Sequence, residues 1–205
     1  MQRWGLTGGI ASGKSTVAAM LRESGFKVLE ADNLAHQLIE PGQPAYNEVV
    51  QQFSREILNE DGRINRATLG AVVFADRSKL AALNAIVHPR VAKATQDQFE
   101  VWERDGVRDA AFVEAALIVE AGMHKQLDGV VVAWCQPQQQ LDRLVARGMS
   151  PSEAKRRIAL QMPNDEKLRY ATATIDCSRS MEETGRQVEA LAAKLKQTAS
   201  GSRSR

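Results

Sequence analysis

The chain has 205 residues, of which 43% are hydrophobic and 25% are charged, and its formal net charge is +2. These values describe one globular domain with room for a sizeable insertion, and so small a charge does not indicate a nucleic-acid binder. No apolar run approaches the roughly 18 residues of a membrane-spanning helix, and no secretory signal opens the chain. Cys135 and Cys177 are far apart and stand in no metal-ligand spacing, so a disulfide is not indicated and we expect a reduced, cytoplasmic protein. We also expect no nucleic-acid, membrane or obligate protein partner.

The start of the chain alternates between strand and helix patterns. Residues 3–8 are a short apolar run that predicts a strand leading into a glycine-rich loop. Residues 14–25 have helical periodicity up to Gly25, which should end the helix. Residues 26–32 predict a second strand that ends in acids, and residues 33–42 predict a short helix ended by proline and glycine.

Residues 45–104 are mostly helical in pattern and carry no strand signal. Asp61-Gly62 marks a turn within them. Pro89 is expected to kink or restart a helix, since the residue before a proline is disfavoured in helical conformation. We interpret this stretch as a helical insertion packed against the core.

Strand patterns return in the second half of the chain. Residues 109–120 and 128–135 are continuous apolar runs, as expected for buried parallel strands, and residues 172–176 are the last strand candidate. The helical patterns of this half are residues 137–148, 150–171 and 180–197, the last with Val188, Leu191 and Leu195 as its apolar stripe. Strands alternating with helices predict an α/β domain with a parallel sheet and right-handed crossovers.

The glycine-rich loop, Gly8-Gly9-Ile10-Ala11-Ser12-Gly13-Lys14-Ser15, satisfies G-x-x-x-x-G-K-[ST]. Gly8 and Gly13 permit backbone angles that turn successive N–H groups inward, and the following helix adds its positive N-terminal end. Lys14 can reach the β- and γ-phosphates, and the Ser15 hydroxyl can bind Mg²⁺. Because the pattern follows a predicted strand and opens a predicted helix, we interpret it as a nucleoside triphosphate site.

Two classes of protein remain compatible with this loop. One is a kinase that transfers the γ-phosphoryl group to a second substrate, and the other is a nucleotide-dependent switch in which water is the acceptor. A guanine-nucleotide switch should carry an N-K-x-D motif, which the sequence lacks; residues 163–167 have similar letters in another order. The pattern therefore favours a kinase.

Acidic residues after two predicted strands are candidates for phosphoryl-transfer chemistry. Asp32 follows the second strand and could accept the proton of the acceptor hydroxyl, or it could instead be a helix N-cap. Glu114 ends the buried run at residues 110–114, where phosphate-loop enzymes hold Mg²⁺, and an ordinary strand-end acid is the alternative.

Basic residues of the region after residue 136 are candidates for a lid over the phosphates. Arg143 and Arg147 are four apart and share one helical face. Each arginine that engages the transferred phosphoryl could be worth on the order of 10³ in rate. For Arg156, Arg157 and Lys167 we expect a solvated charged face instead.

These residues resemble the dephospho-coenzyme A kinase family, whose members phosphorylate the ribose 3′-hydroxyl of dephospho-coenzyme A with ATP as the last step of coenzyme A synthesis. The resemblance covers about residues 4–176. Its segments are LTGGIASGKST, EADNLAHQLIEPGQPAY, DGRINRATLGAVVF, LNAIVHPRV, LIVEAGM and QQLDRLVARGMSPSEAKRRIALQMPNDEK. IVHP and RIALQM in this order are far more specific than the phosphate loop.

The sequence departs from the family pattern at several positions. Ala11 stands where glycine is usual, and a residue with an ordinary φ could still fit there. Glu30 replaces a common aspartate and Ala116 a usual proline. The stretch from Thr172 to Cys177 departs most, because the family generally shows an acidic residue and an asparagine near Thr172 and Cys177, so the resemblance assigns no adenine contacts there.

The resemblance implies an ATP- and Mg²⁺-dependent kinase with dephospho-coenzyme A as its substrate. Its catalytic residues would be Asp32, Lys14 and Arg143; its nucleotide-binding residues Gly8, Gly9, Ala11, Ser12, Gly13, Lys14, Ser15, Thr16 and Arg147; its substrate-binding residues Asp32, Arg66 and His88; and its Mg²⁺-binding residues Ser15 and Glu114. The alternatives are another small-metabolite or nucleoside monophosphate kinase on the same core, or the nucleotide-dependent switch.

The same resemblance implies a single phosphate-loop kinase domain over residues 1–199. Its core would comprise residues 1–34, 107–136 and 172–199, its acceptor-binding insertion residues 35–106, and its lid residues 137–171. Residues 200–205 carry no apolar side chain to bury and are expected to be a disordered tail.

Overall fold

The structure is a computed structural model that describes residues 1–201, with side chains through Gln197. The chain divides into two compact units. The core unit comprises Met1–Glu30 and the chain from Phe99 onward, and the helical unit comprises Ala31–Gln98. The predicted insertion, residues 35–106, corresponds to most of the helical unit.

The core unit is built on one five-stranded parallel sheet with strand order β2-β3-β1-β4-β5. The strands are β1 Gln2–Thr7, β2 Lys27–Glu30, β3 Ala110–Glu114, β4 Gly129–Trp134 and β5 Ala173–Asp176. All five predicted strands are therefore present, and β1 lies at the centre of the sheet. Because the strands are parallel, their carboxyl ends share one edge, which is where sheets of this kind bind ligands.

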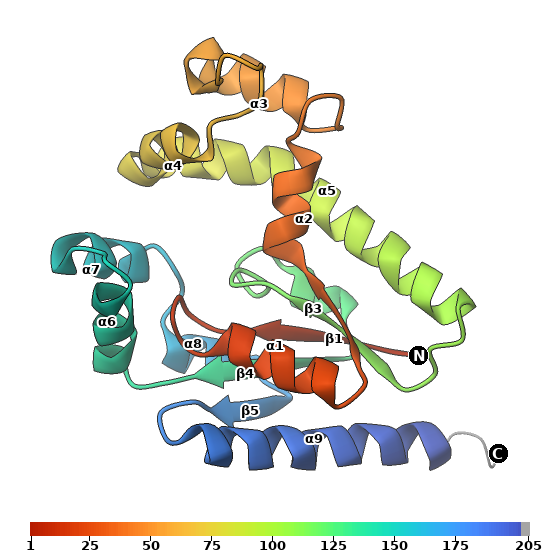
Figure 1. Cartoon of the computed structure of the whole chain (residues 1–205). Coiled ribbons are helices and arrows are strands. Elements are labelled where there is room, and N and C mark those ends of the chain that lie inside the picture. The colour runs from red at the N-terminus through yellow and green to blue at the C-terminus, as the bar shows by residue number, and fades with distance from the viewer. Residues whose placement is uncertain (202–205) are drawn as a thin grey trace. The chain divides into compact units, whose positions relative to one another are not determined.

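Helices α1 and α9 cover one face of this sheet, and Figure 1 shows α9 running along it. The helices of the core unit are α1 Lys14–Glu23, η2 Met123–Gln126, α6 Pro137–Ala146, α7 Pro151–Ala159, α8 Asn164–Leu168 and α9 Met181–Gly201. The predicted stripe of α9, Val188, Leu191 and Leu195, is buried with Val17 and Leu21 of α1. This shared apolar core holds the start of α1, and with it the phosphate loop.

The apolar run at residues 109–120 is a strand only as far as Glu114. The prediction of a longer strand was wrong, because residues 115–119 are buried or half-buried without joining the sheet and Glu120 is exposed. Ile118 is fully buried and packs close to Gly5 of β1. A continuous apolar run indicates burial and not strand geometry, and here the run extends past the end of β3 into a turn.

The helical unit contains α2 Ala31–Leu38, α3 Tyr46–Phe53, η1 Arg55–Ile57, α4 Arg66–Ala75 and most of α5 Arg77–Arg104. The predicted turn at Asp61-Gly62 is confirmed, and an antiparallel bridge joins Leu58 to Ile64 around it. Pro89 does not restart a helix, because α5 continues through it as one element.

Within residues 1–201 no helix has both the length and the apolar character needed to cross a membrane. Helix α9 continues to Gly201. The other residues of the predicted tail, 202–205, lie outside the described residues.

Candidate active site

The phosphate loop connects the carboxyl end of β1 to the start of α1, as predicted. Close backbone approaches require its glycines. A Cβ at Gly8 would lie 2.2 Å from the carbonyl oxygen of Ala133, and a Cβ at Gly13 would lie 2.7 Å from Cys177 Cβ. Gly13 also has a φ of 107°, which disfavours any other residue. The loop is therefore packed against the ends of β4 and β5.

Ala11 adopts a left-handed conformation, with a φ of 59°. The expectation that a residue with an ordinary φ fits at this position was wrong. A left-handed alanine costs roughly 1–2 kcal/mol because its Cβ approaches the following carbonyl oxygen. The loop therefore carries this strain at Ala11.

Lys14, Ser15 and Glu114 meet at the carboxyl edge of the sheet. Lys14 Nζ lies 2.7 Å from Glu114 Oε1, and the Ser15 hydroxyl donates to the same oxygen at 3.0 Å. Glu114 is 5% exposed and is brought here because β3 pairs with β1, so that Glu114 lies opposite Leu6. Glu114 lies on a different element from Lys14 and Ser15, which both belong to α1, and the parallel sheet brings the three together.

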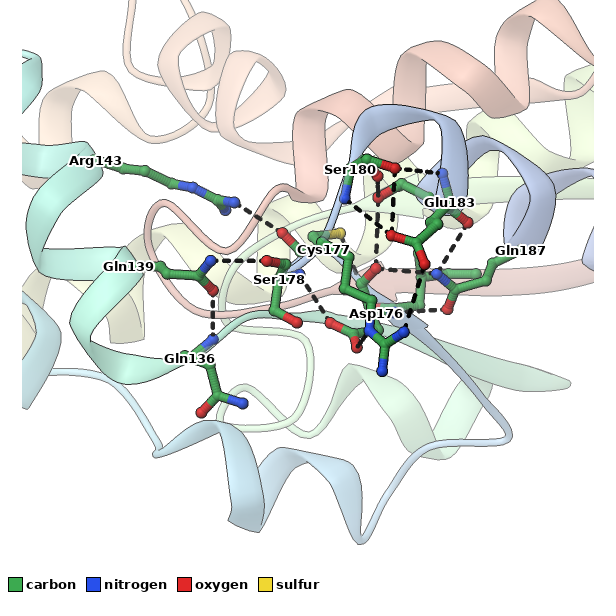
Figure 2. Close-up of polar contacts among 12 residues, drawn as sticks. Gln136, Gln139, Arg143, Asp176, Cys177, Ser178, Ser180, Glu183 and Gln187 are labelled. Carbon is green, nitrogen blue, oxygen red and sulfur yellow. Dashed lines mark hydrogen bonds and ion pairs between the residues drawn. The ribbon is translucent and has the colours of Figure 1, made fainter.

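Arg143 of α6 bridges the phosphate loop and the end of β5. Its guanidinium donates to the carbonyl of Ala11 at 3.1 Å and to that of Cys177 at 2.8 Å. Figure 2 shows the contact with Cys177, with Gln139 donating to the carbonyl of Ser178 beside it. Arg143 thus joins α6, the phosphate loop and the residue after β5 at one point.

A cavity of about 260 Å³ opens beside the phosphate loop and is lined by three arginines, Arg143, Arg147 and Arg179. Met181 and Thr184 of α9 line it as well. Sequence reasoning named Arg143 and Arg147 but missed the α9 side, because nothing local to residues 179–184 indicates a ligand. The cavity therefore borders the phosphate loop and has both cationic and apolar side chains in its wall.

Cys177 also lines this cavity. Burial raises the pKa of the Cys177 thiol to about 11, and the neighbouring Cys135 adds to the shift. Both cysteines are free thiols. Cys177 is therefore a neutral, close-packed side chain at the base of the loop and not a reactive thiolate.

The predicted acceptor-side residues Asp32, Arg66 and His88 lie in the helical unit. Asp32 is exposed and lies inside the first turn of α2, so it does not precede the helix as an N-cap. Burial and the nearby Arg66 lower the pKa of His36, while Asp32 and Glu40 act in the opposite direction. Arg66, exposed at the start of α4, pairs with Glu40 at 3.2 Å. Asp32, His36, Glu40 and Arg66 thus form one charged neighbourhood.

The other substrate-binding candidate, His88, is partly buried in α5, directly before Pro89.

The prediction that Lys167 is part of a solvated face was wrong. Its side chain is fully buried, and its Nζ lies 2.8 Å from Glu120 Oε1 and 2.5 Å from the carbonyl oxygen of Ala116. Arg156 is exposed as expected, and Arg157, partly buried, pairs with Glu153 at 2.7 Å. The helical pattern around Lys167 could not show that this side chain, unlike those of Arg156 and Arg157, is fully buried.

The phosphate loop has features that fit a bound phosphate and Mg²⁺. Among the described residues, the Ser12 hydroxyl is fully buried in the loop and has no hydrogen-bond partner. No group of three or more His, Cys, Asp or Glu side chains in residues 1–201 is placed to hold a metal ion. Mg²⁺ does not need such a cage, since it is usually bound by one or two carboxylates, water and substrate phosphates. Ser15 and Glu114 fit that donor set.

Comparison with known proteins supports the same kind of site. The family model described as dephospho-CoA kinase matches residues 3–183. This chain belongs to the dephospho-CoA kinase family. A dephospho-CoA kinase of Symbiobacterium thermophilum is 46% identical over 187 residues, which cover 91% of this chain and 78% of that protein.

Solved structures with the same fold include TT1252 from Thermus thermophilus, which is 34% identical with a TM-score of 0.78 and 95% and 97% coverage of the two chains. Shikimate kinase from Aquifex aeolicus, 14% identical with a TM-score of 0.53, covers 94% of this chain and 96% of its own and shares the fold alone. The predicted phosphate-loop kinase fold is therefore confirmed.

Membership of the dephospho-CoA kinase family gives the chain its reaction, the ATP-dependent phosphorylation of the ribose 3′-hydroxyl of dephospho-coenzyme A to coenzyme A, the last step of coenzyme A biosynthesis. The alternatives of another small-metabolite kinase and of a nucleotide switch are excluded by this membership.

Proposed function

We propose that the chain carries out this reaction with its phosphate loop, residues 11–16, holding the ATP phosphates. The contact among Lys14, Ser15 and Glu114 is the observation that carries the proposal. Lys14 neutralises charge that develops on the phosphates, while Arg143 and Arg147 add cations beside the nucleotide. The cavity next to the loop is the place we assign to the rest of the nucleotide.

Mg²⁺ is part of the proposal. Ser15 and Glu114 would hold the ion together with phosphate oxygens, and it would supply Lewis-acid neutralisation of phosphate charge. Lys14 now pairs with Glu114, so binding of the nucleotide requires these two side chains to exchange partners. Replacing Glu114 by glutamine should therefore raise the Mg²⁺ concentration needed for half-maximal rate while the fold is kept.

Asp32 is the general base of the proposal, and Arg66 and His88 are its acceptor-binding residues. Asp32 is exposed at the start of α2, which suits a carboxylate that must reach a substrate hydroxyl. Asp32→Asn should lower kcat by roughly 10²–10⁴, the range for loss of a general base, with ATP affinity nearly kept. Asp61→Asn, an acid in the turn of the same unit, is the matched control. Full turnover by Asp32→Asn would refute the assignment.

The reaction itself is tested by ADP release from Mg-ATP, first without acceptor and then with dephospho-coenzyme A. AMP and shikimate serve as control acceptors. Turnover only with dephospho-coenzyme A is the expected result. Slow release that is indifferent to every acceptor would contradict the proposed function.

We also propose a cytoplasmic location. Buried, unpaired Cys135 and Cys177 support a reducing compartment.

A further inference from the structure

Three amide side chains lie against the first half of the phosphate loop, before the residues that are proposed to hold phosphate. Gln161 Oε1 accepts a hydrogen bond from the backbone N–H of Ile10 at 2.7 Å. Gln140 Nε2 donates to the carbonyl of Ile10 at 2.7 Å. Asn164 Oδ1 accepts from the N–H of Gly9 at 3.3 Å. Side chains far along the chain thus satisfy three backbone groups of two loop residues.

The amides also bind one another and the end of β4. Asn164 Nδ2 donates to Gln140 Oε1 and to the carbonyl of Cys135, both at 3.3 Å. Gln140 is only 5% exposed. A Cβ at Gly9 would lie 2.5 Å from Gln140 Nε2 and 2.9 Å from Asn164 Oδ1. The amides therefore lie directly against the loop backbone, and a side chain at position 9 would have to displace them.

The segment that carries two of these amides is itself fixed. The buried Lys167 anchors it to Glu120 and to the Ala116 carbonyl, as described above. The backbone N–H of Met162 donates to Glu120 Oε1 at 3.0 Å. Because Ala116 follows Glu114 by two residues, the same segment contacts both the phosphate loop and the turn after β3.

An anion-binding loop gains affinity when its N–H groups are already converged before the ligand arrives, because less conformational freedom is lost on binding. We propose that Gln140, Gln161 and Asn164 are positioning residues that hold Gly9 and Ile10 and so keep residues 11–16 in their phosphate-binding form. The inference rests on the proposed role of residues 11–16 in ATP binding. It also gives a role to the RIALQM segment.

The test compares three variants of the full chain. Gln161→Met keeps the length of the side chain and removes the acceptor, Gln161→Glu keeps an acceptor oxygen, and Gln138→Met is the control. Gln138 lies on α6 and donates to Asp142 at 2.8 Å. Amide exchange of Ile10 is measured by NMR without ligand, and the Kd of ATP by calorimetry.

Gln161→Met should expose the Ile10 amide and raise its exchange rate and the Kd of ATP by about tenfold each, the effect of leaving one buried donor unpaired. The KM of dephospho-coenzyme A should stay unchanged. Gln161→Glu should keep the Ile10 amide protected, and Gln138→Met should match the wild type in both measurements.

The inference would be overturned if Gln161→Met had the wild-type exchange rate at Ile10 and the wild-type Kd of ATP. It would also be overturned if the Ile10 amide exchanged as fast in Gln161→Glu as in Gln161→Met. Faster exchange across β1 and β4 with an unchanged Kd would also overturn it, since that would indicate a structural role alone. If the wild type itself did not bind ATP, the proposed function would fail. That result is distinct from the outcomes above, in which the wild type binds ATP and only the variants differ.

Discussion

At the scale of single residues, the phosphate loop combines a strained alanine with a close-packed thiol. Ala11 has a φ of 59°, which glycine would adopt without penalty. Ala11→Gly should therefore raise the free energy of unfolding by about 0.5–1 kcal/mol, after allowing for the greater freedom of glycine in the unfolded chain. Urea denaturation measures this change. The matched control is Ala19→Gly on the exposed side of α1, which should lose about 1 kcal/mol. An equal loss in both variants would refute the strain at Ala11.

The Cys177 thiol makes stability depend on alkaline pH. Its pKa is raised to about 11 in the fold by burial, against about 8.5 in an unfolded chain. Between these values the unfolded chain binds fewer protons than the native one, so the free energy of unfolding should fall as the pH rises from about 9 to about 11. The loss should be on the order of 2–3 kcal/mol and should be smaller in Cys177→Ala. Parallel stability–pH curves for the two proteins would contradict it.

At the scale of elements, α8 is anchored by one buried cation. Lys167→Met removes the charged partner of Glu120, which also accepts from the Met162 N–H. It also removes one of two donors to the Ala116 carbonyl, the other being the Thr7 hydroxyl. Because the Glu120 side chain is 22% exposed, we expect a moderate loss of about 1–3 kcal/mol in urea denaturation.

The exposed Lys155 of α7 provides the control for this change. Lys155→Met should alter stability by less than about 0.5 kcal/mol. Adding Glu120→Gln to Lys167→Met should recover part of the loss, because the uncompensated charge is removed. If Lys167→Met were as stable as Lys155→Met, the anchoring role would be wrong.

At the scale of the whole molecule, the sequence predicted the features that depend on local residue patterns. All five strands and the phosphate loop followed from apolar runs, glycines and helix periodicity. The inward position of Lys167, the amides on Ile10 and the α9 side of the cavity depend on contacts between residues far apart in the chain. Such contacts leave no periodic signal, since glutamine or lysine in an amphipathic helix has the same pattern whether it faces solvent or a neighbouring loop.

The division into two units predicts that the two substrates can be perturbed separately. Arg66 belongs to the helical unit and the phosphate loop to the core unit. Arg66→Ala should raise the KM of dephospho-coenzyme A by about ten- to a hundredfold, the effect of losing a charge-assisted hydrogen bond, while the Kd of ATP stays unchanged. Arg63→Ala is the control, because Arg63 is also exposed and also pairs with Glu40. Steady-state kinetics with each substrate varied in turn measures both effects. If Arg66→Ala and Arg63→Ala raised the KM of dephospho-coenzyme A alike, the assignment of Arg66 would be refuted, because the loss of a Glu40 contact that both variants share would explain the result.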